Sequence, residues 1–133
     1  MRLRRETTRV LPLLLLDPSP QSAAELASLL DSAGFEVVTS GDLDAALQAL
    51  RRAFFFALIV VADLTDPSCL VALATLRRRA PRSWMIVAAP QCDAPTCDLI
   101  HRYGGDACVV LPIAAEDLVD RLNAFQARTR PSF

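Results

Sequence analysis

Residues 57–62 read Ala57-Leu58-Ile59-Val60-Val61-Ala62 and are followed directly by Asp63. The six apolar residues occupy consecutive positions and do not alternate with polar ones. Such a strand is expected where helices cover both faces of a sheet, which is typical of parallel sheets. The stretch therefore predicts a buried parallel strand with a carboxylate at its carboxyl end.

Four similar apolar runs flank this one, and a segment of helical periodicity follows each of the five. The predicted strands span residues 10–16, 35–39, 56–62, 84–89 and 107–111. The predicted helices span residues 20–33, 42–52, 68–80, 94–103 and 114–128. This alternation predicts an α/β fold, a doubly wound (βα)5 sheet of five parallel strands in the flavodoxin-like order 2-1-3-4-5.

The size and composition of the chain fit one globular domain. Its 133 residues are 53% hydrophobic and 22% charged, with a net charge of -1. We assign residues 10–128 to the domain, 1–9 to an N-terminal arm and 129–133 to a tail. The charge balance gives no general attraction to nucleic acid or to anionic membranes, and no run reaches the roughly 20 apolar residues needed to span a bilayer.

Two features of the sequence bear on the cellular compartment. The basic start followed by an apolar run resembles a short leader peptide, but residues 17–20 interrupt the run, and the fold needs it as its first strand. The cysteines are Cys69, Cys92, Cys97 and Cys108. Because they are scattered among apolar segments, we expect reduced thiols in a cytoplasmic protein.

Cys92, Cys97 and His101 could begin a zinc site, although the spacing is not a standard one and no fourth ligand follows.

Two acids mark the predicted ligand edge of the sheet. Asp17 follows the first strand and Asp63 follows the third, and in this topology ligands bind between these strand ends. Two carboxylates there could hold Mg²⁺, with water completing its shell. Aspartate after a strand is also a common turn former, which would explain either residue taken alone.

Three motifs give the chain a family resemblance. They read LLLLDP at residues 13–18, ADLTDP at 62–67 and GGDACVVLP at 104–112. With these motifs, residues 11–128 resemble the CheY-like receiver domains of response regulators. The resemblance implies that Asp63 accepts a phosphoryl group from a histidine kinase. It also implies that Asp17, Asp63 and the backbone carbonyl of Thr65 bind Mg²⁺.

The sequence departs from the family pattern at the pocket. Pro18 replaces a second acid, Ala88 replaces a threonine or serine, and Leu111 replaces a lysine. Cys108 replaces an aromatic switch residue, and Pro112 follows the changed Leu111. Phosphoryl transfer depends on positioning and charge neutralisation, so these changes predict slow or absent transfer.

We therefore expect an atypical receiver, or pseudo-receiver, that is not an enzyme and signals mainly by protein contact. Expected partners are a histidine kinase or another signalling protein, or a second copy bound through the fourth helix, fifth strand and fifth helix. One alternative is a working phosphoacceptor at Asp63 with Mg²⁺, where Asp66 could replace the missing acid or only shape the turn. The other is a small enzyme or cofactor-binding flavodoxin-like domain. It is disfavoured because the two prolines of residues 17–20 lack the N–H groups of a phosphate-binding loop.

Overall fold

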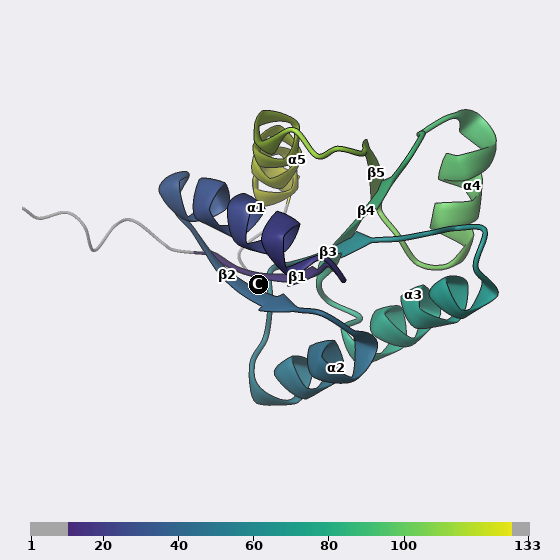
Figure 1. Ribbon diagram of the computed structural model, residues 1–133, viewed down its shortest axis with the longest axis horizontal. Helices are drawn as coiled ribbons and strands as arrows, with labels where there is room; N and C mark the ends of the chain where they lie inside the picture. The colour runs from purple at the N-terminus through teal and green to yellow at the C-terminus, as the bar shows by residue number, and fades with distance from the viewer. Residues whose placement is uncertain (1–10, 129–133) are drawn as a thin grey trace, which may run out of the picture.

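The computed structural model describes residues 11–128, in which five strands and five helices alternate (Figure 1). The strands are β1 (Leu11–Leu16), β2 (Phe35–Ser40), β3 (Ala57–Val61), β4 (Trp84–Ala89) and β5 (Ala107–Val110). The helices are α1 (Pro20–Ser32), α2 (Leu43–Arg52), α3 (Pro67–Arg79), α4 (Ala94–Arg102) and α5 (Ala115–Arg128). The predicted arm 1–9, residue 10 of the first strand and the tail 129–133 lie outside the described residues.

The strands form one parallel sheet in the order β2-β1-β3-β4-β5. This confirms the predicted fold class and strand order, and the observed ends of the elements differ from the predicted ones by one residue or none. No helix within residues 11–128 is long and apolar enough to cross a membrane.

The consecutive apolar residues of the strands fill two separate cores. Leu13, Leu15 and Ile59 pack in the core beneath α1 and α5. Leu14 and Leu58 point the other way, into the core beneath α2, α3 and α4. Figure 1 shows α1 and α5 on one side of the sheet and α2 and α3 on the other. Burial of both faces explains why β1 and β3 have no polar face.

Four helices begin at a side chain that caps their free N–H groups. The caps are Ser19 for α1, Asp42 for α2, Asp66 for α3 and Asp93 for α4. In a βα repeat these helix starts lie near the carboxyl ends of the strands. Three carboxylates are therefore added to the edge of the sheet that also carries Asp17 and Asp63.

At the opposite edge, Arg77 at the end of α3 joins three segments of the chain. Its guanidinium donates to the Gly104 carbonyl at 2.9 Å, to the Ala80 carbonyl at 2.7 Å and to the Ser83 carbonyl. It also forms an ion pair with Asp106 at 3.3 Å. Arg77 thus holds the end of α3, the entry to β4 and the entry to β5 together.

We predict that Arg77→Ala lowers the free energy of unfolding by about 2 kcal/mol, because the change leaves carbonyls without their charged donor. The matched control is Arg78→Ala, at an exposed position in the same helix turn. Urea unfolding followed by circular dichroism measures both variants. Equal losses of unfolding free energy in the two variants would show that the hydrogen bonds and the ion pair of Arg77 do not stabilise the fold.

Candidate functional site

The candidate site lies at the carboxyl edge of the sheet, where β1 and β3 end. Leu16 of β1 pairs with Val60 of β3 in parallel register. Asp17 and Asp63 follow these two strands, so both acids leave neighbouring strands at the same edge. In a sheet of order 2-1-3-4-5, ligands bind at this position.

Asp17 is a buried carboxylate, with 6% of its surface exposed. Its Oδ1 accepts a hydrogen bond from the Ser19 N–H at 2.9 Å. Its own N–H donates to the Ser40 carbonyl of β2 at 3.0 Å. The two bonds fix Asp17 where the chain leaves β1, and the bond to Oδ1 offsets part of the cost of burying the carboxylate.

Asp63 is exposed and is held by Thr65, two residues later. Its Oδ1 accepts from the Thr65 hydroxyl at 2.6 Å and from the Thr65 N–H at 3.0 Å. These two bonds, the hydroxyl first, lower the pKa of Asp63 below its ordinary value, because both stabilise the charged carboxylate. Asp63 is therefore an ionised, solvent-exposed carboxylate at neutral pH.

The side chain of Thr65 has a role that the sequence reasoning missed. The family resemblance assigned only its backbone carbonyl, whereas its N–H and hydroxyl contact Asp63 in the structure. The signal was present in the sequence, because aspartate readily accepts from the backbone two residues further on in a turn.

Asp66 acts as a helix cap. Its Oδ1 accepts from the N–H of Ser68 at 3.0 Å and from the hydroxyl of Ser68 at 2.8 Å. The carboxylate that could have replaced the missing acid of the pocket is thus bonded at the start of α3. Of the two interpretations of Asp66, the structure supports the local one.

A cleft of about 640 Å³ opens beside Asp17, between α1 and the loop after β5. Three of the predicted degenerate positions, Pro18, Leu111 and Pro112, line it. The remaining lining residues are Ser19, Ser22, Glu25, Leu26, Leu29, Val61, Pro90 and Ile113. The lining thus contains two acids and no cation, and Asp63 does not belong to it.

Ala88 forms part of the sheet next to this edge and is fully buried. It pairs with Val61 of β3 and Val109 of β5, and its carbonyl accepts from the Ala62 N–H at 3.0 Å. Its methyl side chain offers no hydroxyl to a bound anion.

The fit of these residues to Mg²⁺ is incomplete. Within residues 11–128 no three His, Cys, Asp or Glu side chains lie together as a metal-binding group. Asp17, Asp63 and the Thr65 carbonyl are the groups that would hold the ion, and one oxygen of each carboxylate already accepts a hydrogen bond. Mg²⁺ commonly binds through one or two carboxylates and keeps several waters, so the set fits only a weakly held ion.

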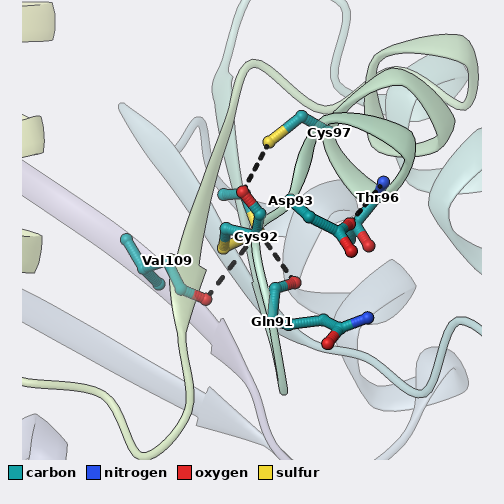
Figure 2. The surroundings of a disulfide bond; sticks show 7 residues. Gln91, Cys92, Asp93, Thr96, Cys97 and Val109 are labelled. Atoms are coloured by element: carbon teal, nitrogen blue, oxygen red, sulfur yellow. Dashed lines mark hydrogen bonds between the residues drawn. A yellow bond between two sulfur atoms is a disulfide. The ribbon is translucent and has the colours of Figure 1, made fainter.

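The expectation of reduced cysteines is wrong for two of the four. Cys92, in the loop after β4, forms a disulfide with Cys108 of β5, with a Cα–Cα distance of 6.0 Å (Figure 2). Cys69 and Cys97 are free thiols. The scattered spacing in the sequence did not reveal this pair, because the path of the loop brings together residues 16 positions apart.

The cysteines and His101 do not form a zinc site. Cys92 is used by the disulfide, and the Cys97 thiol points to the Cys92 carbonyl, with an Sγ–O distance of 3.5 Å (Figure 2). His101 Nδ1 lies 2.9 Å from the Gly105 carbonyl. His101 therefore interacts with the chain at the end of its own helix.

Solved structures share this fold at low sequence identity. A response regulator from Thermotoga maritima matches with a TM-score of 0.80 and 17% identity, covering 90% of this chain and 99% of that one. The chemotaxis protein CheY4 from Vibrio cholerae matches with a TM-score of 0.78 and 18% identity, covering 88% and 99%. These likenesses show that the chain has the CheY-like receiver fold.

A further match comes from a protein of Burkholderia pseudomallei that is provisionally assigned to pilus assembly. Its TM-score is 0.78 at 22% identity, and the match covers 98% of each chain. No protein-family model and no curated protein sequence matches the chain.

We predict that Thr65→Val raises the pKa of Asp63 towards its ordinary value, because the hydroxyl bond is lost and only the backbone N–H remains. The wild-type bonds favour folding above the pKa of Asp63 in the unfolded chain. That contribution disappears as the pH falls through the lowered pKa of the folded protein. The Asp63 carboxyl carbon followed by NMR between acidic and neutral pH measures the change.

The matched control is Thr96→Val. Asp93 also has a lowered pKa, caused first by the Thr96 hydroxyl and then by the Thr96 N–H. The control should shift Asp93 and leave Asp63 unchanged. An unchanged Asp63 titration in Thr65→Val would refute the assigned cause.

Proposed function

We propose that this chain is an atypical receiver domain, not an enzyme, that acts in two-component or phosphorelay signalling mainly by protein–protein contact. Phosphorylation of Asp63 is impaired or absent in this proposal. Support comes from the receiver fold and from the position of Asp17 and Asp63 at neighbouring strand ends. The observation that carries the proposal is the cleft beside Asp17, which contains acids and apolar walls but no cation.

The physical reason is the charge of the group to be bound. A phosphoryl group adds a charge of about −1.5 to −2 at neutral pH. Its transfer relies on positioning and on neutralisation of that charge. The edge of the sheet already carries Asp17, Asp63 and the capping acids, while Leu111 replaces the expected ammonium. An anion in the cleft beside Asp17 would meet Asp17 and Glu25, and no cation is among the described residues that line this cleft.

A working phosphoacceptor is the alternative function at the same residues. The exposure of Asp63 and its lowered pKa favour it, because the nucleophile is ionised and reachable. Mg²⁺ at Asp17, Asp63 and the Thr65 carbonyl would supply the positive charge that the side chains lack. The two functions differ in how much phosphoryl group Asp63 accepts.

A second candidate function is a role in pilus assembly. It is favoured by the protein from Burkholderia pseudomallei, whose match covers nearly the whole of both chains. In that role the receiver fold would serve as a binding module within a larger apparatus. Efficient phosphorylation of Asp63 would argue against a role in pilus assembly, because a binding module needs no chemistry at that residue.

The surface that we propose for protein contact is formed by α4, β5 and α5. β5 lies at the edge of the sheet, and Val110 on it has 50% of its surface exposed. Asp117, Asp120 and Arg121 of α5 line a cleft together with Val110. Charges of both signs beside an apolar residue suit a second copy related by twofold symmetry, in which Arg121 of each copy can meet an acid of the other. A histidine kinase or another signalling protein is the other proposed partner. The proposed function also implies a cytoplasmic location.

We predict that acetyl phosphate with Mg²⁺ adds little or no phosphoryl mass to the wild-type chain. Pro18→Asp combined with Leu111→Lys restores an acid and a cation to the cleft, so this double variant should gain phosphorylation at least about tenfold. Intact-protein mass spectrometry measures the added mass.

The control is the same double variant carrying Asp63→Asn, which should gain no mass. Rapid, stoichiometric phosphorylation of the wild type at Asp63 would overturn the proposed impairment and leave the conventional receiver function. A gain that survives Asp63→Asn would show that the modified residue is a different one.

We also predict that Val110→Asp abolishes self-association, because it adds a buried like charge at the centre of a twofold contact. The control is Val71→Asp on α3, where 61% of the valine is exposed on a different surface. Sedimentation equilibrium of the full chain measures the oligomeric state. A wild-type monomer at all concentrations would exclude the homodimer, and equal effects of both variants would exclude this surface.

A further inference from the structure

The Cys92–Cys108 disulfide encloses one element of the fold. Cys92 lies just before α4, and Cys108 lies in β5 just after it. The covalent loop thus contains the whole of α4 and the turn that follows. Figure 2 shows Cys92 and Cys97 close together at the start of this helix. The bond ties the entrance of α4 to the central residues of the neighbouring strand.

Apart from this bond, α4 is thinly attached to the domain. It has nine residues, of which only Ile100 is buried. Its carboxyl end is secured by the turn, where the Gly105 N–H donates to the Ile100 carbonyl at 2.9 Å. Its amino end has the Asp93 cap, a local bond to the Thr96 N–H at 3.0 Å. Cys97 in the first turn also packs against the core beneath α2, α3 and α4, and the disulfide adds a covalent link between this amino end and β5.

The bond can be reached from solvent on one side. Cys108 is buried, with 7% of its surface exposed, and Cys92 is half-buried. Both cysteines line a cleft of about 400 Å³ that Asp117, Asp120 and Arg121 of α5 also line. Because Cys92 is the more exposed of the two residues, we take its Sγ as the atom that a thiolate attacks, with Cys108 as the leaving sulfur.

The buried thiol has partners once the bond is broken. In the disulfide Cys108 carries no proton, and its Sγ lies 3.9 Å from the carbonyls of Gln91 and Val109. A reduced Cys108 can donate to either carbonyl, so neither redox state leaves it without a contact. The fold thus accommodates the bonded and the open form.

We propose that the Cys92–Cys108 bond is a reversible redox crosslink that fixes the amino end of α4 to β5 and frees it on reduction by a protein dithiol. The effect on binding rests on the proposed function, because α4 forms part of the proposed contact surface. Cys108 stands where the family resemblance places a switch residue, and Ala88 offers no hydroxyl for coupling. In this chain the redox state of the cysteines sets the arrangement of α4. In the cytoplasm, disulfides are usually transient or redox-sensing, which agrees with this role.

The exchange is balanced in atoms and electrons. A thiolate of the dithiol attacks Cys92 Sγ, the Cys92–Cys108 bond breaks, and its electron pair goes to Cys108 Sγ, which takes up a proton. The second thiolate then attacks the mixed disulfide and releases Cys92 as a thiolate, which is protonated in turn. The dithiol loses two electrons and two protons, and the cysteine pair gains both. Reoxidation is the reverse reaction with an oxidised dithiol.

The first measurement counts reactive thiols in the folded full chain by alkylation and peptide mass spectrometry. Without added reductant we expect Cys69 and Cys97 to be alkylated and Cys92 to be linked to Cys108. After treatment with dithiothreitol all four cysteines of the chain should react. Alkylation of Cys92 and Cys108 under oxidising conditions would overturn the proposal. Resistance of the bond to millimolar dithiothreitol in the folded protein would overturn it equally, because the crosslink would then be permanent.

The second measurement is amide hydrogen exchange of residues 92–102. We expect exchange at the start of α4 to rise about tenfold on reduction, while the strands change little. Cys92→Ser should match the reduced wild type whatever the redox buffer. Cys97→Ser should behave as the wild type in both states, because Cys97 lies beside the bond and takes no part in it.

Equal exchange of α4 in the oxidised and reduced wild type would overturn the proposal. This comparison needs no variant to fold and involves no partner. A failure of the proposed function, seen as a chain that neither self-associates nor binds a signalling protein, therefore leaves the result on α4 unchanged.

Discussion

The rest of the structure depends on a parallel sheet that is buried on both faces. Because helices cover both sides, consecutive residues of the central strands, such as Leu13 and Leu14 of β1, are apolar, and their polar neighbours follow at the strand ends. The same winding brings the starts of the helices, with their capping acids, to the carboxyl edge. Asp17 and Asp63 thus lie at an edge of the sheet that is acidic because the fold also brings the capping acids of the helices there.

This acidic edge constrains which chemical modifications the domain can accept as signals. An added phosphoryl group brings negative charge to an edge that is already acidic, and Leu111 and Ala88 offer neither a cation nor a hydroxyl. Conversion of a disulfide to two protonated thiols changes no charge. The net charge of the domain is therefore the same in the disulfide and the dithiol forms of Cys92 and Cys108, whereas a phosphoryl group would add negative charge.

The sequence predicted the sheet because one pattern, apolar runs alternating with helical periodicity, specifies both elements and topology. It predicted the edge that carries Asp17 and Asp63 because the order of the strands fixes that edge. It did not predict the Cys92–Cys108 bond, which depends on the path of the loop after β4. It did not predict the bonds of Arg77 to three segments either, because those partners are brought together only by folding.

A conformational signal requires contacts that differ between two states. In the receiver domains that the chain resembles, these contacts involve a hydroxyl, a lysine and an aromatic ring. This chain has Ala88, Leu111 and Cys108 at those positions. Apolar side chains of that size hardly distinguish two positions of a helix. A covalent bond that exists in one state and is absent in the other does distinguish them, and this bond lies just before α4, a helix in which Ile100 is the buried residue. Under the two proposals made above, the position of α4 would answer to the redox state of Cys92 and Cys108 and not to the charge at Asp63.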